Sequence, residues 1–182
     1  MKSRKFQNLE RWNLLSIPIL FVIGSFFHFF YELSGNAAVI GMIAAVNESV
    51  WEHQKMALLP VIGWWTIFYL VKGGSYQIDK RKWFAGAACA LCTSILTIPL
   101  IFYFYSSAFG AHWLIVDVLI LLLAVAAGQL LGMHVFKHSN GMPLAMSILI
   151  ILLIIAAFAV FTFDPPQIPW FRDSLTGRYG IR

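Results

Sequence analysis

Five long apolar segments alternate with short polar segments along the chain. They cover residues 13–33, 50–72, 84–105, 113–136 and 144–163. Each is close to the ~20 residues that a helix needs to cross roughly 30 Å of hydrocarbon. The pattern predicts an all-α integral membrane bundle of five transmembrane helices. A shorter apolar stretch, residues 37–46, cannot span a bilayer and is predicted to lie at the interface or to re-enter the membrane.

Lysine and arginine are unevenly distributed over the connecting segments. With a cytoplasmic N-terminus, nine of the thirteen lie on the cytoplasmic side: Lys2, Arg4, Lys5, Arg11, Lys72, Lys80, Arg81, Lys82 and Lys137. Lys55, Arg172, Arg178 and Arg182 lie on the other side. Because basic residues are retained in the cytoplasm, this distribution predicts an N-terminus inside the cell, a C-terminus outside it, and a multi-pass protein of the cell membrane.

Composition supports a membrane protein and excludes other classes. Of 182 residues, 60% are hydrophobic and 12% are charged, whereas a soluble domain has about 25% charged residues. Soluble enzymes and disordered regulators are therefore excluded. The net charge of +5 is spread over several loops and forms no basic stripe, so the predicted partner is the lipid bilayer and not nucleic acid. The loops are too short for a second domain, and residues 164–182 form a tail after a single membrane domain.

Polar and ionisable residues gather on the predicted outer side of the bundle. Nine residues form this outer polar set: His28, Glu32, Asn47, Glu48, Glu52, His53, His112, Asp117 and Asp164. The inner half of the spans holds little besides Gln129 and His134. Ionisable groups are costly in or beside a bilayer, so this asymmetry indicates a functional site on the outer side.

The spacing of these residues suggests their chemistry. His28 and Glu32, like Glu48 and Glu52, are four residues apart and would share a face on a helix. Histidine and carboxylate side chains from several helices suit a divalent metal such as zinc, so the predicted metal ligands are His28, Glu52 and His53. The predicted catalytic carboxylates are Glu32, Glu48, Glu52 and Asp117. The predicted ligand-binding residues are Tyr31, Asn47 and Trp51.

The same residues also have structural interpretations. Ser49 and Glu52 have the spacing of a capping box at a helix start. Glu48, Glu52 and Lys55 would share a helix face and form an interfacial ion pair. His112, next to Trp113, has the position of an ordinary interfacial residue.

Three functions fit this pattern. The first is a metal-dependent intramembrane hydrolase that acts on an amphiphilic substrate at the outer leaflet. The second is a non-enzymatic protein that binds, senses or transports a cation or a small polar ligand; the scarcity of polar groups in the inner half argues against full transport. The third is a structural partner of another membrane protein.

Two further segments carry specific predictions. Gly128 and Gly132 form a G-x-x-x-G seam, which would pack against another helix of this chain or against a second copy in an oligomer. The tail holds three prolines between residues 165 and 169 and is predicted to be extended. We expect it to cover the outer polar set as a lid, with Arg172 or Asp173 within reach of its charges.

Three strings carry a resemblance to a known family: residues 28–35 (HFFYELSG), 46–55 (VNESVWEHQK) and 165–173 (PPQIPWFRD). They resemble a family of small bacterial multi-pass membrane proteins described as a domain of unknown function, DUF6512. The likeness covers most of the chain, and its most specific part is N-E-S-x-W-E-H. The resemblance implies a bacterial multi-pass membrane protein, and it carries no activity, substrate or cofactor.

Overall fold

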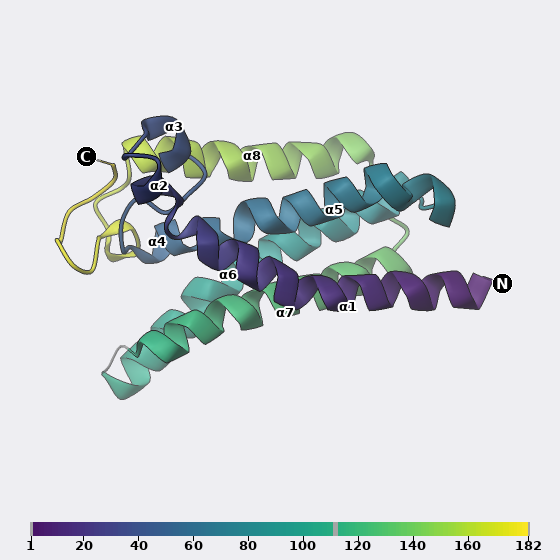
Figure 1. Ribbon diagram of the computed structural model, residues 1–182, viewed down its shortest axis with the longest axis horizontal. Coiled ribbons are helices and arrows are strands. Elements are labelled where there is room, and N and C mark those ends of the chain that lie inside the picture. Colours follow the sequence, from purple (N-terminus) through teal and green to yellow (C-terminus); the bar gives the residue numbers. More distant parts are fainter. Residues whose placement is uncertain (1, 111–112, 182) are drawn as a thin grey trace.

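The computed structural model describes residues 2–110 and 113–181, and it is built from helices. The long helices are α1 (Lys2–Phe27), α5 (Lys55–Tyr76), α6 (Lys80–Phe109), α7 (Leu114–His138) and α8 (Leu144–Phe163). The short ones are α2 (Phe30–Leu33), α3 (Ala38–Gly41), α4 (Val50–His53) and the 3-10 turn η1 (Pro169–Phe171). The long helices run side by side, with the two termini at opposite ends of the bundle (Figure 1).

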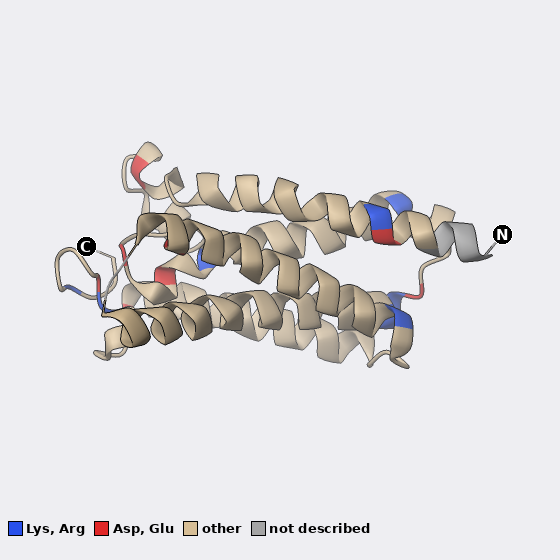
Figure 2. Cartoon of the chain, turned by 90° about the horizontal axis from the view of Figure 1, so that it is seen from below, with Lys and Arg blue, Asp and Glu red and all other residues tan. Residues whose placement is uncertain are grey.

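The bundle has the surface of a membrane protein. Among the described residues, five helical segments are long and apolar enough to cross a membrane. Lysine, arginine, aspartate and glutamate gather at the two ends of the bundle, and its middle is nearly free of them (Figure 2). The predicted fold class, an all-α bundle of five membrane-spanning helices, is confirmed.

The first long helix ends earlier than predicted. α1 stops at Phe27, where the backbone N–H groups of His28 and Phe29 bond to carbonyls three residues back, at 3.3 and 3.0 Å. This tighter turn separates α1 from α2. The apolar stretch 37–46 contains only the single-turn helix α3, which lies at the same end of the molecule as the C-terminal tail (Figure 1).

Ser49 determines where the second membrane segment begins. Its hydroxyl oxygen accepts a hydrogen bond from the Glu52 N–H at 3.3 Å, which makes Ser49 the N-cap of α4. The Ser49 N–H is bonded to Asn47 Oδ1 at 2.9 Å, so the Glu52 carboxylate does not complete a capping box. Asn47 and Glu48 therefore precede the helix, and the rule that residues i and i+4 share a face does not apply to Glu48 and Glu52.

The glycine seam of α7 faces α6 of the same chain. A Cβ on Gly128 would lie 2.0 Å from Ser94 Oγ and 2.5 Å from the Ala90 carbonyl oxygen. A Cβ on Gly132 would lie 2.6 Å from the Gly86 carbonyl oxygen. Both glycines are buried, so a second copy of the chain would have to displace α6 in order to use this seam.

We expect Gly128→Ala to destabilise the protein by about 1–3 kcal/mol, because the new methyl group overlaps a backbone carbonyl that cannot move without shifting α6. The matched control is Gly63→Ala in α5, where the same methyl group meets nothing within 4 Å. Thermal unfolding in detergent measures both variants. Equal stability of the two would contradict the close α6–α7 approach.

The half of the bundle nearer the N-terminus holds one buried polar network. The Gln129 side chain is fully buried; its Oε1 accepts from Trp65 Nε1 and its Nε2 donates to Ser16 Oγ, both at 2.6 Å. Asn13 Nδ2 donates to the Gln129 carbonyl at 2.8 Å. These bonds join α1, α5 and α7, and they explain Gln129 as a structural residue.

Candidate functional site

Two histidines and a glutamate meet near the C-terminal end of the molecule. His28 Nε2 lies 3.4 Å from Glu48 Oε1, and His53 Nε2 lies 3.2 Å from Glu48 Oε2. One ligand atom from each residue lies within 4.8 Å of the other two. We call these three residues, which are half-buried, the His–Glu–His triad.

Local structure positions each member of the triad. His28 occupies the turn after α1, Glu48 immediately precedes the N-cap of α4, and His53 is the last residue of α4. His53 Nδ1 lies 2.9 Å from the Ser49 carbonyl oxygen and donates to it, which leaves Nε2 directed at Glu48. The two imidazole rings are stacked, with centroids 5.3 Å apart and an interplanar angle of 16°.

The triad approaches the dimensions of a metal site. In a tetrahedral zinc site with bonds of about 2.0–2.1 Å, ligand atoms lie roughly 3.3 Å apart. The two histidine–glutamate separations, 3.4 and 3.2 Å, are close to this value, and each involves a different oxygen of Glu48. With one ligand atom from each residue, the three atoms lie within 4.8 Å of one another, so the side chains would have to draw closer around an ion. Three protein ligands leave a fourth position open, as in catalytic zinc sites. The Ser49 carbonyl that accepts from His53 is the kind of outer partner that holds a metal-binding imidazole in one orientation.

The surroundings affect protonation at the two triad residues outside the membrane-spanning segments. Partial burial lowers the pKa of His28, since it disfavours the imidazolium form. The hydrogen bond from His53 is the main reason that the pKa of Glu48 lies below its usual value. Near neutral pH these shifts favour a neutral His28 and an ionised Glu48, the forms in which both side chains bind metals.

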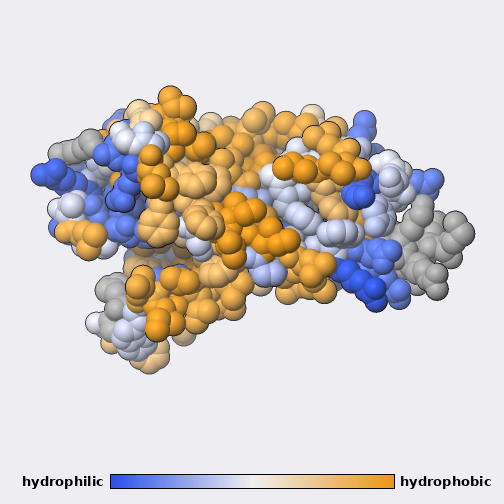
Figure 3. Space-filling view, in the orientation of Figure 1, coloured by the Kyte–Doolittle hydropathy of each residue, from blue (hydrophilic) through white to orange (hydrophobic). Residues whose placement is uncertain are grey.

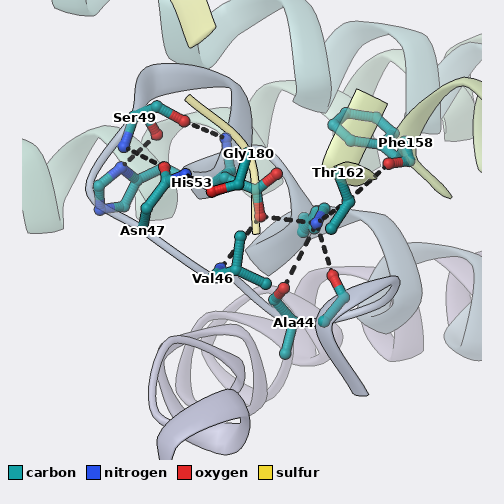
Figure 4. A network of polar contacts seen from close by, with 11 residues as sticks. Ala44, Val46, Asn47, Ser49, His53, Phe158, Thr162 and Gly180 are labelled. Atoms are coloured by element: carbon teal, nitrogen blue, oxygen red, sulfur yellow. Dashed lines mark hydrogen bonds and ion pairs between the residues drawn. The ribbon is translucent and has the colours of Figure 1, made fainter. Parts of the chain in front are cut away.

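Glu52 is predicted as a metal ligand and as a catalytic carboxylate, and the structure places its carboxylate in an ion pair outside the triad. Its Oε2 lies 2.6 Å from Lys55 Nζ and also accepts from the Val46 N–H at 3.0 Å (Figure 4). Both Glu52 and Lys55 are buried, with exposed fractions of 2% and 0%. The predicted ion pair with Lys55 is thus confirmed for Glu52, and Glu48 occupies the place between the histidines.

The predicted ligand-binding residues have structural contacts. Asn47 Nδ2 donates to the Gly180 carbonyl at 3.2 Å, which ties the loop before α4 to the tail (Figure 4). Trp51 packs on Phe158 and Phe171, with ring centroids 4.3 and 4.6 Å away. Tyr31 is buried and borders a small cavity of about 140 Å³. None of these contacts brings the three side chains into the triad.

The remaining acidic residues of the outer polar set are dispersed. Glu32 is exposed on α2 and borders the small cavity beside His28 and Glu48. Asp117, in the first turn of α7, accepts a hydrogen bond from the Tyr105 hydroxyl. Asp164 is exposed at the end of α8, and His112 lies outside the described residues. Of the predicted catalytic carboxylates, Glu48 belongs to the triad, and Asp117 faces the same larger cavity.

That larger cavity has a volume of about 1070 Å³. Its polar wall consists of the triad, Asp117 and the tail residues Arg172, Asp173, Ser174 and Thr176. Its apolar wall comes from α5, α6 and α7 and includes Met56, Ile98, Phe102, Val118 and Leu121. The surface is hollowed between the end of the α6–α7 hairpin and the rest of the molecule (Figure 3). The triad therefore borders a space that both polar and apolar side chains line.

Backbone hydrogen bonds hold the tail beside the triad. The Ser174 N–H donates to the Glu48 carbonyl at 3.4 Å, and the Ile181 N–H donates to the Thr162 carbonyl at 2.8 Å. Asp173 is buried, and its carboxylate accepts from the Leu175 N–H at 3.0 Å and from the Thr176 hydroxyl. Burial alone would raise the pKa of Asp173, but these hydrogen bonds lower it below the usual value. That the tail acts as a lid stays a prediction.

Sequence reasoning missed two residues of this region. Tyr105 is 12 positions from Asp117, at the far end of the preceding helix, and the short α6–α7 connection brings them together. The short segment between these two predicted spans is a signal in the sequence that could have placed Tyr105 near Asp117. Thr162 donates to the Phe158 carbonyl at 2.8 Å and lies 2.5 Å from Lys55 Nζ (Figure 4). No local pattern connects Thr162 with a residue 107 positions away.

Comparison with known proteins gives a family but no activity. No curated protein and no solved structure matches the chain. A family profile described as "Family of unknown function (DUF6512)" matches residues 1–181. This match covers nearly the whole chain and agrees with the resemblance carried by the three strings. The chain therefore belongs to the DUF6512 family.

Proposed function

We propose that this protein is a metal-dependent membrane hydrolase that acts on an amphiphilic substrate. The observation that carries the proposal is the His–Glu–His triad on the wall of a large cavity: one potential ligand atom from each of its three residues lies within 4.8 Å of the other two. The cell membrane is the proposed location, because the site lies at one end of a membrane-spanning bundle.

The triad residues have the role of metal ligands in this proposal. His28 and His53 contribute imidazole nitrogens and Glu48 contributes carboxylate oxygen, a set that suits zinc. A bound divalent cation would lower the pKa of a water molecule to about 7 and so supply a nucleophile at neutral pH. Asp117 faces the same cavity and is the group available to move a proton.

The proposed reaction is hydrolysis of an ester. The oxygen of water attacks the carbonyl carbon and forms a new C–O bond, while Asp117 accepts a proton from that water. The bond from the carbonyl carbon to the alcohol oxygen then breaks, and its electron pair stays on that oxygen. Asp117 returns the proton to this leaving oxygen, so that one acid and one alcohol are released. Tyr105 donates a hydrogen bond to Asp117 and holds the carboxylate in place.

Cobalt binding tests the metal site, because Co²⁺ in a site with histidine and carboxylate ligands has visible absorption bands. Purified protein carrying a tag without histidine should bind one equivalent of Co²⁺, and Zn²⁺ should displace it. His53→Ala should lose this binding. The matched control is His138→Ala, whose ring likewise bonds the carbonyl four residues earlier (Nδ1 to His134, 3.0 Å) but lies outside the triad. Unchanged cobalt binding in His53→Ala would overturn the proposed site.

Hydrolysis is tested separately with the p-nitrophenyl ester of octanoic acid. Turnover should disappear on chelation, return with Zn²⁺, and be absent in Asp117→Asn. Metal binding without turnover would favour the second candidate, a non-enzymatic metal-binding or sensing protein. One observation supports that candidate: each Glu48 carboxylate oxygen already faces a histidine, so the three side chains are assembled without any substrate.

A further inference from the structure

We infer that the large cavity binds a phospholipid of the bilayer, with the acyl chain against α7 and the phosphate on Arg172. This inference rests on the proposed function, because it names the substrate class of the same site. It also makes Arg172 a specificity-determining residue, which selects the phosphate group and does not bind the metal. The argument comes from the division of the cavity, from its opening, and from the charges on its wall.

Different parts of the chain supply the apolar and the polar residues that line the cavity. The apolar part of the lining comes from three helices: Met56 in α5, Ile98 and Phe102 in α6, and Val118 and Leu121 in α7. Most of the polar lining comes from the triad, Asp117 and residues 172–177 of the tail. A binding site with predominantly apolar lining and a few polar groups suits an amphiphilic ligand, which has an apolar chain and a polar head.

The cavity opens toward the side of the bundle. The hollow in the molecular surface separates the end of the α6–α7 hairpin from the rest of the molecule (Figure 3). Two apolar residues that line the cavity are largely exposed, Phe29 at 52% and Leu114 at 79%. In a membrane-spanning bundle such side chains contact lipid, so a lipid chain can reach the cavity without leaving apolar surroundings.

Among the described charged residues that line the cavity, Arg172 lacks a partner of opposite charge. Its Nε donates to the Gly177 carbonyl at 3.3 Å, which orients the guanidinium. Among the residues that the structure describes, no carboxylate lies within 4.0 Å of its side-chain nitrogens. The side chain is exposed, so its remaining N–H groups are available to a ligand.

The carboxylates of the same wall are already occupied. Glu48 faces the two histidines, Asp117 accepts from Tyr105, and Asp173 accepts from the Leu175 N–H and the Thr176 hydroxyl. Each of these negative charges therefore has a hydrogen-bond donor close by. The positive charge of Arg172 has no negative charge beside it among the described residues. A guanidinium donates to phosphate through two parallel hydrogen bonds, a geometry that lysine cannot match. The complementary ligand is an anionic phosphate ester attached to an acyl chain.

Lipid binding in an uncharged maltoside detergent tests the inference, with three probes. Dioctanoyl phosphatidylglycerol carries both chain and phosphate, dioctanoylglycerol carries the chain alone, and inorganic phosphate carries the anion alone. Arg172→Gln should weaken binding of the phospholipid by about 10-fold, as expected for loss of charge-assisted hydrogen bonds, and leave dioctanoylglycerol unchanged. The control is Arg178→Gln, an exposed arginine of the same tail that does not line the cavity.

A second pair of variants tests the apolar wall. Val118→Trp should block the cavity and weaken binding of both lipids. Leu119→Trp is the matched control, because Leu119 is the next residue, has a similar exposed fraction (47% against 45%), and does not line the cavity. Equal lipid binding by Val118→Trp and Leu119→Trp would overturn the location of the chain.

Other outcomes separate this inference from the metal proposal. Phospholipid binding that Arg172→Gln leaves unchanged, or displacement by inorganic phosphate at equal concentration, would overturn the phosphate assignment. Cobalt binding is measured on the same variants and should persist in Arg172→Gln. Arg172-dependent phospholipid binding in a protein that takes up no cobalt would support the lipid site and overturn the metal-dependent hydrolase.

Discussion

Replacing Lys55 by methionine is expected to destabilise the folded protein by about 3–5 kcal/mol, the usual cost of removing one partner of a buried ion pair. The substitution leaves the Glu52 carboxylate, 2% exposed, without its counter-charge. SDS-induced unfolding of the detergent-solubilised protein measures the effect. This is the largest stability change that we expect from a single substitution.

The expected size follows from what the Lys55 ammonium group binds. Besides Glu52 Oε2 at 2.6 Å, Nζ lies 2.7 Å from the Gly41 carbonyl and 2.5 Å from Thr162 Oγ1 (Figure 4). These partners belong to α3, α4 and α8, so one side chain connects three separate elements. Methionine is unbranched like lysine and one atom shorter, and it loses all of these bonds. The segment before α4 and the end of α8 would both lose an attachment.

Two controls make the Lys55 prediction specific. Lys72→Met removes an exposed lysine from the same helix and should leave stability within about 0.5 kcal/mol of the original value. The double variant Glu52→Gln/Lys55→Met should be more stable than Lys55→Met alone, because no unpaired charge remains buried. If Lys55→Met unfolds at the same SDS concentration as Lys72→Met, the ion pair does not stabilise the fold.

The second large effect concerns Glu48. Glu48→Gln should weaken metal binding by at least about 100-fold, more than the loss of an outer-sphere partner causes, because it removes the only carboxylate of the triad. Glutamine has nearly the same shape, and the half-exposed position tolerates a neutral side chain. Cobalt titration measures the affinity, and thermal unfolding should show a folded protein.

Glu52→Gln supplies the contrast for Glu48→Gln. It leaves Lys55 charged and buried, so it should lower stability strongly, whereas folded protein should retain cobalt binding because the triad is unchanged. The two carboxylates are four positions apart and have different expected roles: Glu48 in metal binding and Glu52 in stability. Loss of cobalt binding from folded Glu52→Gln, with retention in Glu48→Gln, would reverse the assignment and restore the ligand set His28, Glu52 and His53.

The position of Glu52 outside the His–Glu–His triad has a definite physical cause. The rule that residues i and i+4 share a face holds inside a continuous helix. Ser49 caps α4, so Glu48 lies outside the helix and turns toward the histidines, while Glu52 lies inside it and turns toward Lys55. The same limit applies to His28 and Glu32, which the turn after α1 separates. Helical periodicity gives the directions of side chains only within one continuous helix, and both of these pairs cross a helix end.

The sequence by itself determined the five-helix membrane bundle and the residue types of the site. Apolar runs of membrane length can satisfy their backbone hydrogen bonds only as helices, so length and composition were enough. Only the tertiary structure decided which carboxylate joins His28 and His53 and that Arg172 lines the same cavity. These contacts join parts of the chain far apart in sequence, and they depend on helix ends and side-chain directions that no local pattern encodes.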